Sequence, residues 1–93
     1  MAGAILSLQG GHRMKNHLQT RKHLRDIPRL ADFEALINSA TLSETDKQII
    51  RLHYIEQKNF AYIGDSLGFS EETIEEHHKR ALKKIAQIID TET

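Results

Sequence analysis

Apolar residues recur at spacings of three and four along most of the chain, which is the periodicity of amphipathic helices. A helix over residues 28–39 is predicted by its apolar positions, which are Leu30, Phe33, Leu36 and Ile37. Pro28, the only proline, is expected in the first turn of this helix, where its missing N–H group leaves no hydrogen bond unmade. A weaker pattern, marked by Leu18 and Leu24, predicts another helix over residues 14–25.

The next helix is predicted to begin at Ser43 and to end near residue 56. Ser43 can cap the helix with its hydroxyl, Asp46 follows three residues later as in a capping box, and Leu42 provides an apolar residue before the cap. The apolar positions that follow are Ile49, Ile50, Leu52, Tyr54 and Ile55. Cap signal and periodicity therefore agree on one helix.

A short helix over residues 60–67 and a longer one after it complete the pattern. Asn59 is expected to cap the short helix, and Gly68 stands where a left-handed residue would end it. Ser70 is expected to cap the last helix, whose apolar stripe consists of Ile74, His78, Ala81, Leu82, Ile85, Ile88 and Ile89. We expect the end of this stripe to pack on the helix at 28–39, and the alternative is a homodimer seam.

These elements predict an all-α fold of four to five helices. A short helix, a turn containing glycine and a longer helix are the parts of a helix-turn-helix, whose second helix enters the major groove of DNA. Helical hairpins with glycine turns also occur in proteins that touch no DNA. The pattern by itself therefore favours double-stranded DNA as the partner without establishing it.

Charge divides the chain unequally, although its net charge is zero. Residues 1–30 contain six basic residues against one acidic residue, Asp26, whereas residues 31–93 contain seven against twelve. The basic residues of the first part are Arg13, Lys15, Arg21, Lys22, Arg25 and Arg29. We expect residues 1–27 to be a partly flexible basic N-terminal arm and residues 28–93 to be the helical domain. The arm either contacts nucleic acid or is a solvated leader.

Several classes of chemistry are disfavoured by the sequence. The chain has no cysteine, so it has no disulfide, thiolate metal site or cysteine nucleophile, and a cytoplasmic location is the simplest expectation. Ser43, Ser70 and Thr73 fall at expected cap positions, and no glycine-rich phosphate loop is present, so we expect no catalysis and no cofactor. The apolar run AGAILSL is far shorter than the ~20 residues that span a bilayer, so no membrane anchor is expected.

The neighbouring histidines His77 and His78 raise the possibility of a metal site. Successive residues on a helix point about 100° apart, and neither histidine has a helical partner four residues away, so we expect no metal here. We expect His78 to be packed, with a partner for its ring nitrogen, and His77 to lie on the surface or face DNA.

The run from Leu42 to Ile85, LSETDKQIIRLHYIEQKNFAYIGDSLGFSEETIEEHHKRALKKI, resembles region 4 of bacterial sigma factors and related helix-turn-helix regulators. The resemblance rests on the LSE opening, the RLHY stretch, the LGFS turn and the closing RALKKI. It implies a stand-alone domain that binds promoter DNA and can bind RNA polymerase. It places base and phosphate contacts on Glu71, Glu72, Thr73, Glu75, Glu76, His77, Lys79 and Arg80, with Asn59 and Ser70 offering backbone N–H groups to phosphates.

Two acids and one glycine depart from the family pattern. Glu75 and Glu76 stand where the family commonly has basic or small polar residues, so phosphate contact there would be repulsive. Both acids precede a basic residue by four, which favours helix ion pairs with Lys79 and Arg80. Gly64 replaces the usual alanine, which keeps a close helix crossing but weakens the short helix by about 1 kcal/mol.

The leading expectation is a DNA-binding transcription regulator that reads DNA with the helix starting at Ser70. Its affinity would then come from Lys79, Arg80, Lys83, Lys84 and the basic arm, because cations supply most of the non-specific affinity for DNA. One alternative is a protein-interaction adaptor that binds RNA polymerase or a sigma partner through the acidic face. Another is a phage DNA-recognition module used in packaging.

Overall fold

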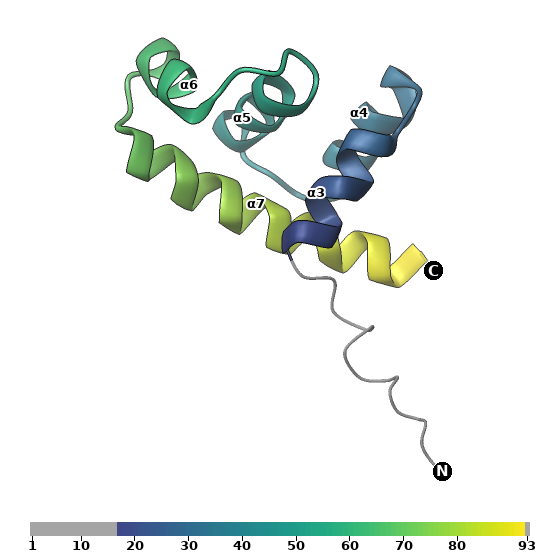
Figure 1. Cartoon of the computed structure of the whole chain (residues 1–93). Helices are drawn as coiled ribbons and strands as arrows, with labels where there is room; N and C mark the ends of the chain where they lie inside the picture. Colours follow the sequence, from purple (N-terminus) through teal and green to yellow (C-terminus); the bar gives the residue numbers. More distant parts are fainter. Residues whose placement is uncertain (1–16, 93) are drawn as a thin grey trace.

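The computed structural model describes residues 17–92 as five helices, with no strand within that range. They are α3 (His17–Asp26), α4 (Leu30–Ser39), α5 (Glu44–Tyr54), α6 (Phe60–Leu67) and α7 (Glu71–Glu92). The predicted all-α fold is therefore confirmed. Figure 1 shows α7 running the length of the molecule, and each of the other four helices packs against it.

Two groups of buried apolar side chains hold the helices on α7. The larger joins α3, α4, α5 and α7 through Leu24, Phe33, Leu36, Ile37, Ile50, Leu82, Ile85 and Ile89. The smaller consists of Ile49, Ile63 and Ile74, all with 0% exposure, and joins α5 and α6 to the first half of α7. Burial of such side chains stabilises each contact by about 1.5–3 kcal/mol per residue.

The end of the apolar stripe on α7 packs within the chain, as expected. Ile85 and Ile89 are buried in the larger core together with side chains of α4, and Ile88 packs against it. The residues of this stripe already have partners in their own chain, which favours internal packing, and the alternative of a homodimer stays a prediction.

Pro28 does not lie in the first turn of α4, so that prediction is wrong. The N-cap of α4 is Arg29, with the extended dihedrals φ −112° and ψ 132°, and Pro28 precedes it. The ring of a proline disfavours helical dihedrals for the residue before it. Pro28 therefore separates α3, which ends at Asp26, from α4.

Helix α3 occupies a segment that the charge pattern assigns to the arm. Its Leu24 is 2% exposed and belongs to the larger core, and α3 packs on α7. The start predicted at residue 14 and the basic residues Arg13 and Lys15 lie outside the described residues.

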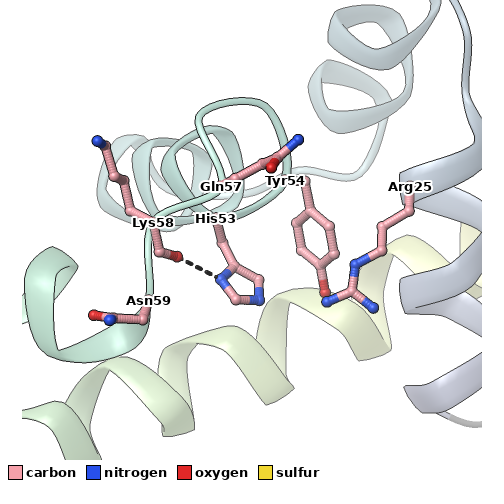
Figure 2. Close-up of a pocket in the computed structure, with 6 residues that line it drawn as sticks. All are labelled: Arg25, His53, Tyr54, Gln57, Lys58 and Asn59. Carbon is pink, nitrogen blue, oxygen red and sulfur yellow. Dashed lines mark hydrogen bonds between the residues drawn. The ribbon is translucent and has the colours of Figure 1, made fainter.

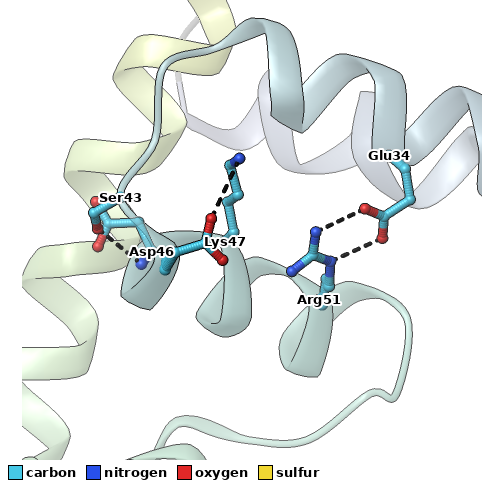
Figure 3. A network of polar contacts seen from close by, with 6 residues as sticks. Glu34, Ser43, Asp46, Lys47 and Arg51 are labelled. Carbon is cyan, nitrogen blue, oxygen red and sulfur yellow. Dashed lines mark hydrogen bonds and ion pairs between the residues drawn. The ribbon is translucent and has the colours of Figure 1, made fainter.

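The N-cap predicted for α5 is confirmed, but the full capping box is not. The backbone N–H of Asp46 donates to the hydroxyl of Ser43 at 3.1 Å, and α5 ends at Tyr54 instead of residue 56 (Figure 3). In the same view Arg51 of α5 donates two hydrogen bonds of 2.8 Å to the carboxylate of Glu34 on α4. This ion pair lowers the pKa of Glu34 and raises that of Arg51, chiefly through their hydrogen bonds.

The turn after α6 requires glycine at two positions. Gly68 has φ +83°, in the left-handed region that side chains disfavour, which confirms the predicted helix end. The N–H groups of Gly68 and Phe69 both donate to the carbonyl of Gly64, at 2.8 and 2.9 Å. A Cβ atom on Gly64 would lie only 2.5 Å from the carbonyl oxygen of Phe69, so this glycine permits the turn to fold back on α6.

No helix within residues 17–92 is long and apolar enough to cross a bilayer.

Candidate nucleic-acid interface

The first residues of α7 are exposed to solvent, and the helix is anchored by a buried residue in its first turn. The hydroxyl of Ser70 accepts a hydrogen bond from the N–H of Thr73 at 3.1 Å, which confirms the predicted cap. Ile74 is completely buried against α5 and α6 and anchors the helix, whereas Ser70, Glu71 and Glu72 are exposed. The first turn of α7 is therefore rigidly held and open to an approaching surface.

The short helix α6 lies before this tip with its own cap in place. The side chain of Asn59 accepts a hydrogen bond from the N–H of Tyr62 at 2.8 Å. Asn59 and Tyr62 are exposed, and Phe60 is half-buried against the smaller core, as expected. The short helix, the turn and the long helix therefore have the arrangement of a helix-turn-helix.

The residues expected to contact DNA, from the resemblance or, for Lys83, from charge, are mostly accessible. Those with exposed side chains are Asn59, Ser70, Glu71, Glu72, Glu76, Lys79, Arg80 and Lys83, and those that are half-buried are Thr73, Glu75 and His77. On α7, positions 72, 76, 79 and 83 follow the spacing of one helical face. This face is acidic over its first two turns and basic over the next two.

Glu75 faces α3 and not the exposed side of α7. It lines a pocket of about 180 Å³ together with Arg21 of α3 and Lys79. The ion pairs predicted for Glu75 with Lys79 and for Glu76 with Arg80 are absent from the described part of the chain. The carboxylate of Glu75 thus lies among cations of its own molecule, where it does not oppose phosphates directly.

The basic residues of α3 and its flank are used in different ways. Lys22 forms an exposed ion pair of 3.0 Å with Asp26, and Arg25 lies over the ring of Tyr54, 5.5 Å from its centroid. Arg21 is half-buried and Arg29 is exposed at the start of α4.

Asp46 contacts two residues of the candidate interface, a role that the capping-box pattern did not reveal. Its side chain is 2% exposed and accepts a hydrogen bond from Nδ1 of His77 at 2.7 Å, while Arg80 lies 3.7 Å away. The guanidinium of Arg80 also lies 2.8 Å from Nδ1 of His77, so His77, Arg80 and the carboxylate of Asp46 form one cluster. The expectation that His77 lies on the surface holds only in part, because its side chain is half-buried against Asp46, and the alternative that it faces DNA stays a prediction.

His78 is packed and partnered, as expected. Its Nε2 shares a hydrogen bond of 2.6 Å with the hydroxyl of Tyr54, and the rings of His53 and Phe60 lie against it. Burial lowers the pKa of His78 to about 3 and raises that of Tyr54 to about 12. His77 and His78 therefore serve two separate intramolecular contacts, one to Asp46 and one to Tyr54.

Fold and site together define the class of the protein as a helix-turn-helix DNA-binding domain. Residues 40–87, just over half of the chain, match the family described as sigma-70, region 4, and the chain belongs to that family. The matched range covers α5, α6 and most of α7 and leaves α3 and α4 outside it. No curated protein and no solved structure matches the chain.

Proposed function

We propose that this protein regulates transcription by reading duplex DNA with α7. The observation that carries the proposal is the leading end of α7, which is anchored by Ile74 and exposed at Glu71 and Glu72. A recognition helix needs this combination, because its N-terminal residues must reach base edges while its position stays fixed.

The charges along α7 suit base contacts near its start and phosphate contacts further along. Glu72 or Glu76 can accept a hydrogen bond from the amino group of cytosine, which gives sequence preference. Lys79 and Lys83, further along the same face, supply attraction to phosphates. The acids near the tip weaken the general attraction, so we expect modest affinity that depends strongly on salt.

Two further elements belong to this proposal. We place the division between the arm and the helical domain before His17, because α3 contributes Leu24 to the core. The arm proper would then contribute Arg13 and Lys15 to DNA binding. RNA polymerase is the protein partner that the family membership favours.

DNA affinity measured against salt concentration tests the proposal. For the whole chain and a duplex selected from random sequence, log affinity should fall linearly with log salt. Lys79→Gln and Lys83→Gln should each reduce the slope by about 1. Lys47→Gln removes the same charge from α5, where Lys47 lies 3.7 Å from Glu44, and should leave the slope unchanged. Absence of any DNA binding at low salt would refute the proposal.

An adaptor that binds a basic protein surface is the second candidate. It is favoured by the exposed carboxylates of Glu71, Glu72 and Glu76, which cover the tip where DNA phosphates would approach. Binding of purified RNA polymerase that is abolished by Glu72→Gln with Glu76→Gln, together with no affinity for DNA, would favour this candidate.

A further inference from the structure

A polar pocket of about 480 Å³ lies between α3 and the loop that connects α5 to α6. Figure 2 shows Arg25 of α3 on one side, Gln57, Lys58 and Asn59 of the loop on the other, and His53 and Tyr54 between them. Basic and amide side chains line this space, and no acidic side chain does. Its lining therefore suits an anion.

The two cations of the pocket have no counter-ion. Within residues 17–92 neither Arg25 nor Lys58 forms an ion pair with a carboxylate, unlike Lys22, Lys47 and Arg51. Both contact aromatic rings instead. Arg25 lies over Tyr54, whereas the ammonium of Lys58 lies 4.8 Å from the ring centroid of Tyr62, which does not line the pocket, and it points away from Arg25 (Figure 2). Such contacts orient a cation while leaving its charge available.

The loop wall of the pocket is fixed in shape. Nδ1 of His53 donates to the carbonyl of Lys58 at 2.8 Å, and the N–H of Lys58 donates to the carbonyl of Leu52 at 2.9 Å. Gln57 has φ +61°, an unfavourable conformation that these bonds maintain. A fixed wall lowers the entropy cost of holding a ligand.

The pocket also lies where DNA would pass. Asn59 lines it and caps α6, the first helix of the helix-turn-helix, which lies across the phosphate backbone in such domains. One turn earlier on α3, Arg21 lines the neighbouring pocket together with Lys79 and the acidic Glu75. The cations of α3 thus lie between the basic part of α7 and the start of α6, with the carboxylate of Glu75 among them.

We propose that the pocket between Arg25 and the 57–59 loop binds a phosphate group of the DNA backbone, beside the contacts of α7. The inference rests on the proposed function and adds α3 to the interface. A guanidinium group matches phosphate oxygens with paired N–H donors, and the amides of Gln57 and Asn59 can add further donors.

Salt dependence of binding to a duplex of unrelated sequence tests the contact. The double variant Arg25→Gln with Lys58→Gln should reduce the slope of log affinity against log salt by about 1, because Arg25 serves one phosphate in the pocket, and Arg25→Gln alone should account for most of the loss. Arg25→Lys, which keeps the charge, should retain most of the slope. Lys47→Gln is the matched control and should not change it. An unchanged slope in the double variant would overturn the backbone contact.

Inorganic phosphate, added at constant ionic strength, distinguishes a free phosphate from the backbone. Saturable shifts in the backbone amide signals of Lys58 and Asn59, lost in the double variant, would support a phosphate site even if DNA binding were unaffected. A native chain that binds no DNA would contradict the proposed function. The phosphate titration alone would then show whether the pocket binds phosphate. No saturable shift and no change in slope would overturn the proposal.

Discussion

Single residues at the turn and beneath α7 set the geometry on which recognition depends. Gly64 is the clearest case, because helix propensity and packing oppose each other there. Replacing a helical glycine by alanine normally stabilises a helix by about 1 kcal/mol. Here the added Cβ would lie 2.5 Å from the carbonyl oxygen of Phe69, and this backbone atom can move only with the turn.

We expect Gly64→Ala to lower the free energy of unfolding by about 1–2 kcal/mol, since such overpacking typically costs about 1–3 kcal/mol. Urea unfolding followed by circular dichroism measures the change. Ser66→Ala on the exposed side of the same helix is the control, and it should leave stability unchanged or raise it slightly. Stabilisation by Gly64→Ala would show that the turn tolerates a side chain.

His78 gives the protein a stability that depends on pH. Burial lowers its pKa to about 3, whereas an unfolded histidine titrates near 6.5, so between these values the unfolded state binds the additional proton. Stability must therefore fall as pH is lowered from 6.5 toward 3, by at most about 1.4 kcal/mol per pH unit from this residue. Burial also lowers the pKa of His53, which acts in the same direction.

We expect His78→Leu to flatten the dependence of unfolding free energy on pH between 6.5 and 4. His23→Leu, at an exposed position of α3, should leave the dependence as it is in the native chain. Equal pH dependence in His78→Leu and the native protein would mean that another group controls stability in this range.

At the residue scale, the sequence predicted caps well and side-chain partners poorly. Ser43, Asn59, Gly68 and Ser70 act locally, so a few neighbouring residues determine their role. Asp46 instead contacts His77, 31 positions away, and no local pattern encodes that pair. Its position in a capping box even indicated a different partner.

The proposed function rests on α7, whose exposed face changes from acidic to basic along its length. Glu72 and Glu76 precede Lys79 and Lys83 on this face. If the face meets DNA, Glu72→Lys with Glu76→Lys should raise non-specific DNA affinity by about tenfold or more at low salt, since each added contact steepens the salt dependence.

Asp32→Lys with Glu44→Lys is the control, because it makes the same change in net charge away from α7 and from the 57–59 loop. Both control positions are exposed, on α4 and at the start of α5. Equal gains in affinity for the two double variants would indicate a general charge effect and no contact along α7.

At the element scale, the periodic pattern predicted all five helices, with errors at their ends. Pro28 ended α3 instead of starting α4, because its effect on the preceding residue outweighed its suitability for a first turn. The end of α5 moved to Tyr54, where the chain turns into the loop that carries Gln57. The charge distribution suggested a basic arm over residues 1–27, and it does not predict that α3 packs on α7.

At the scale of the whole molecule, α3 and α4 extend a helix-turn-helix into a five-helix domain. The family match begins only after these two helices, yet Leu24 and Phe33 share one core with Leu82 and Ile85 of α7. Helices α3 and α4 cover the apolar C-terminal half of α7 and leave its first, N-terminal turn exposed. The sequence predicted the stripe, but only the packing distinguishes an internal partner from a second copy.

Nuclear magnetic resonance of the whole chain, titrated with a selected duplex, tests the central claim most directly. The account predicts that the backbone amide signals of residues 70–80 on α7 and 58–62 at the start of α6 shift or broaden saturably. Signals of residues 31–39 on α4 should stay in place. Saturable changes confined to α4, or none on α7, would contradict the account.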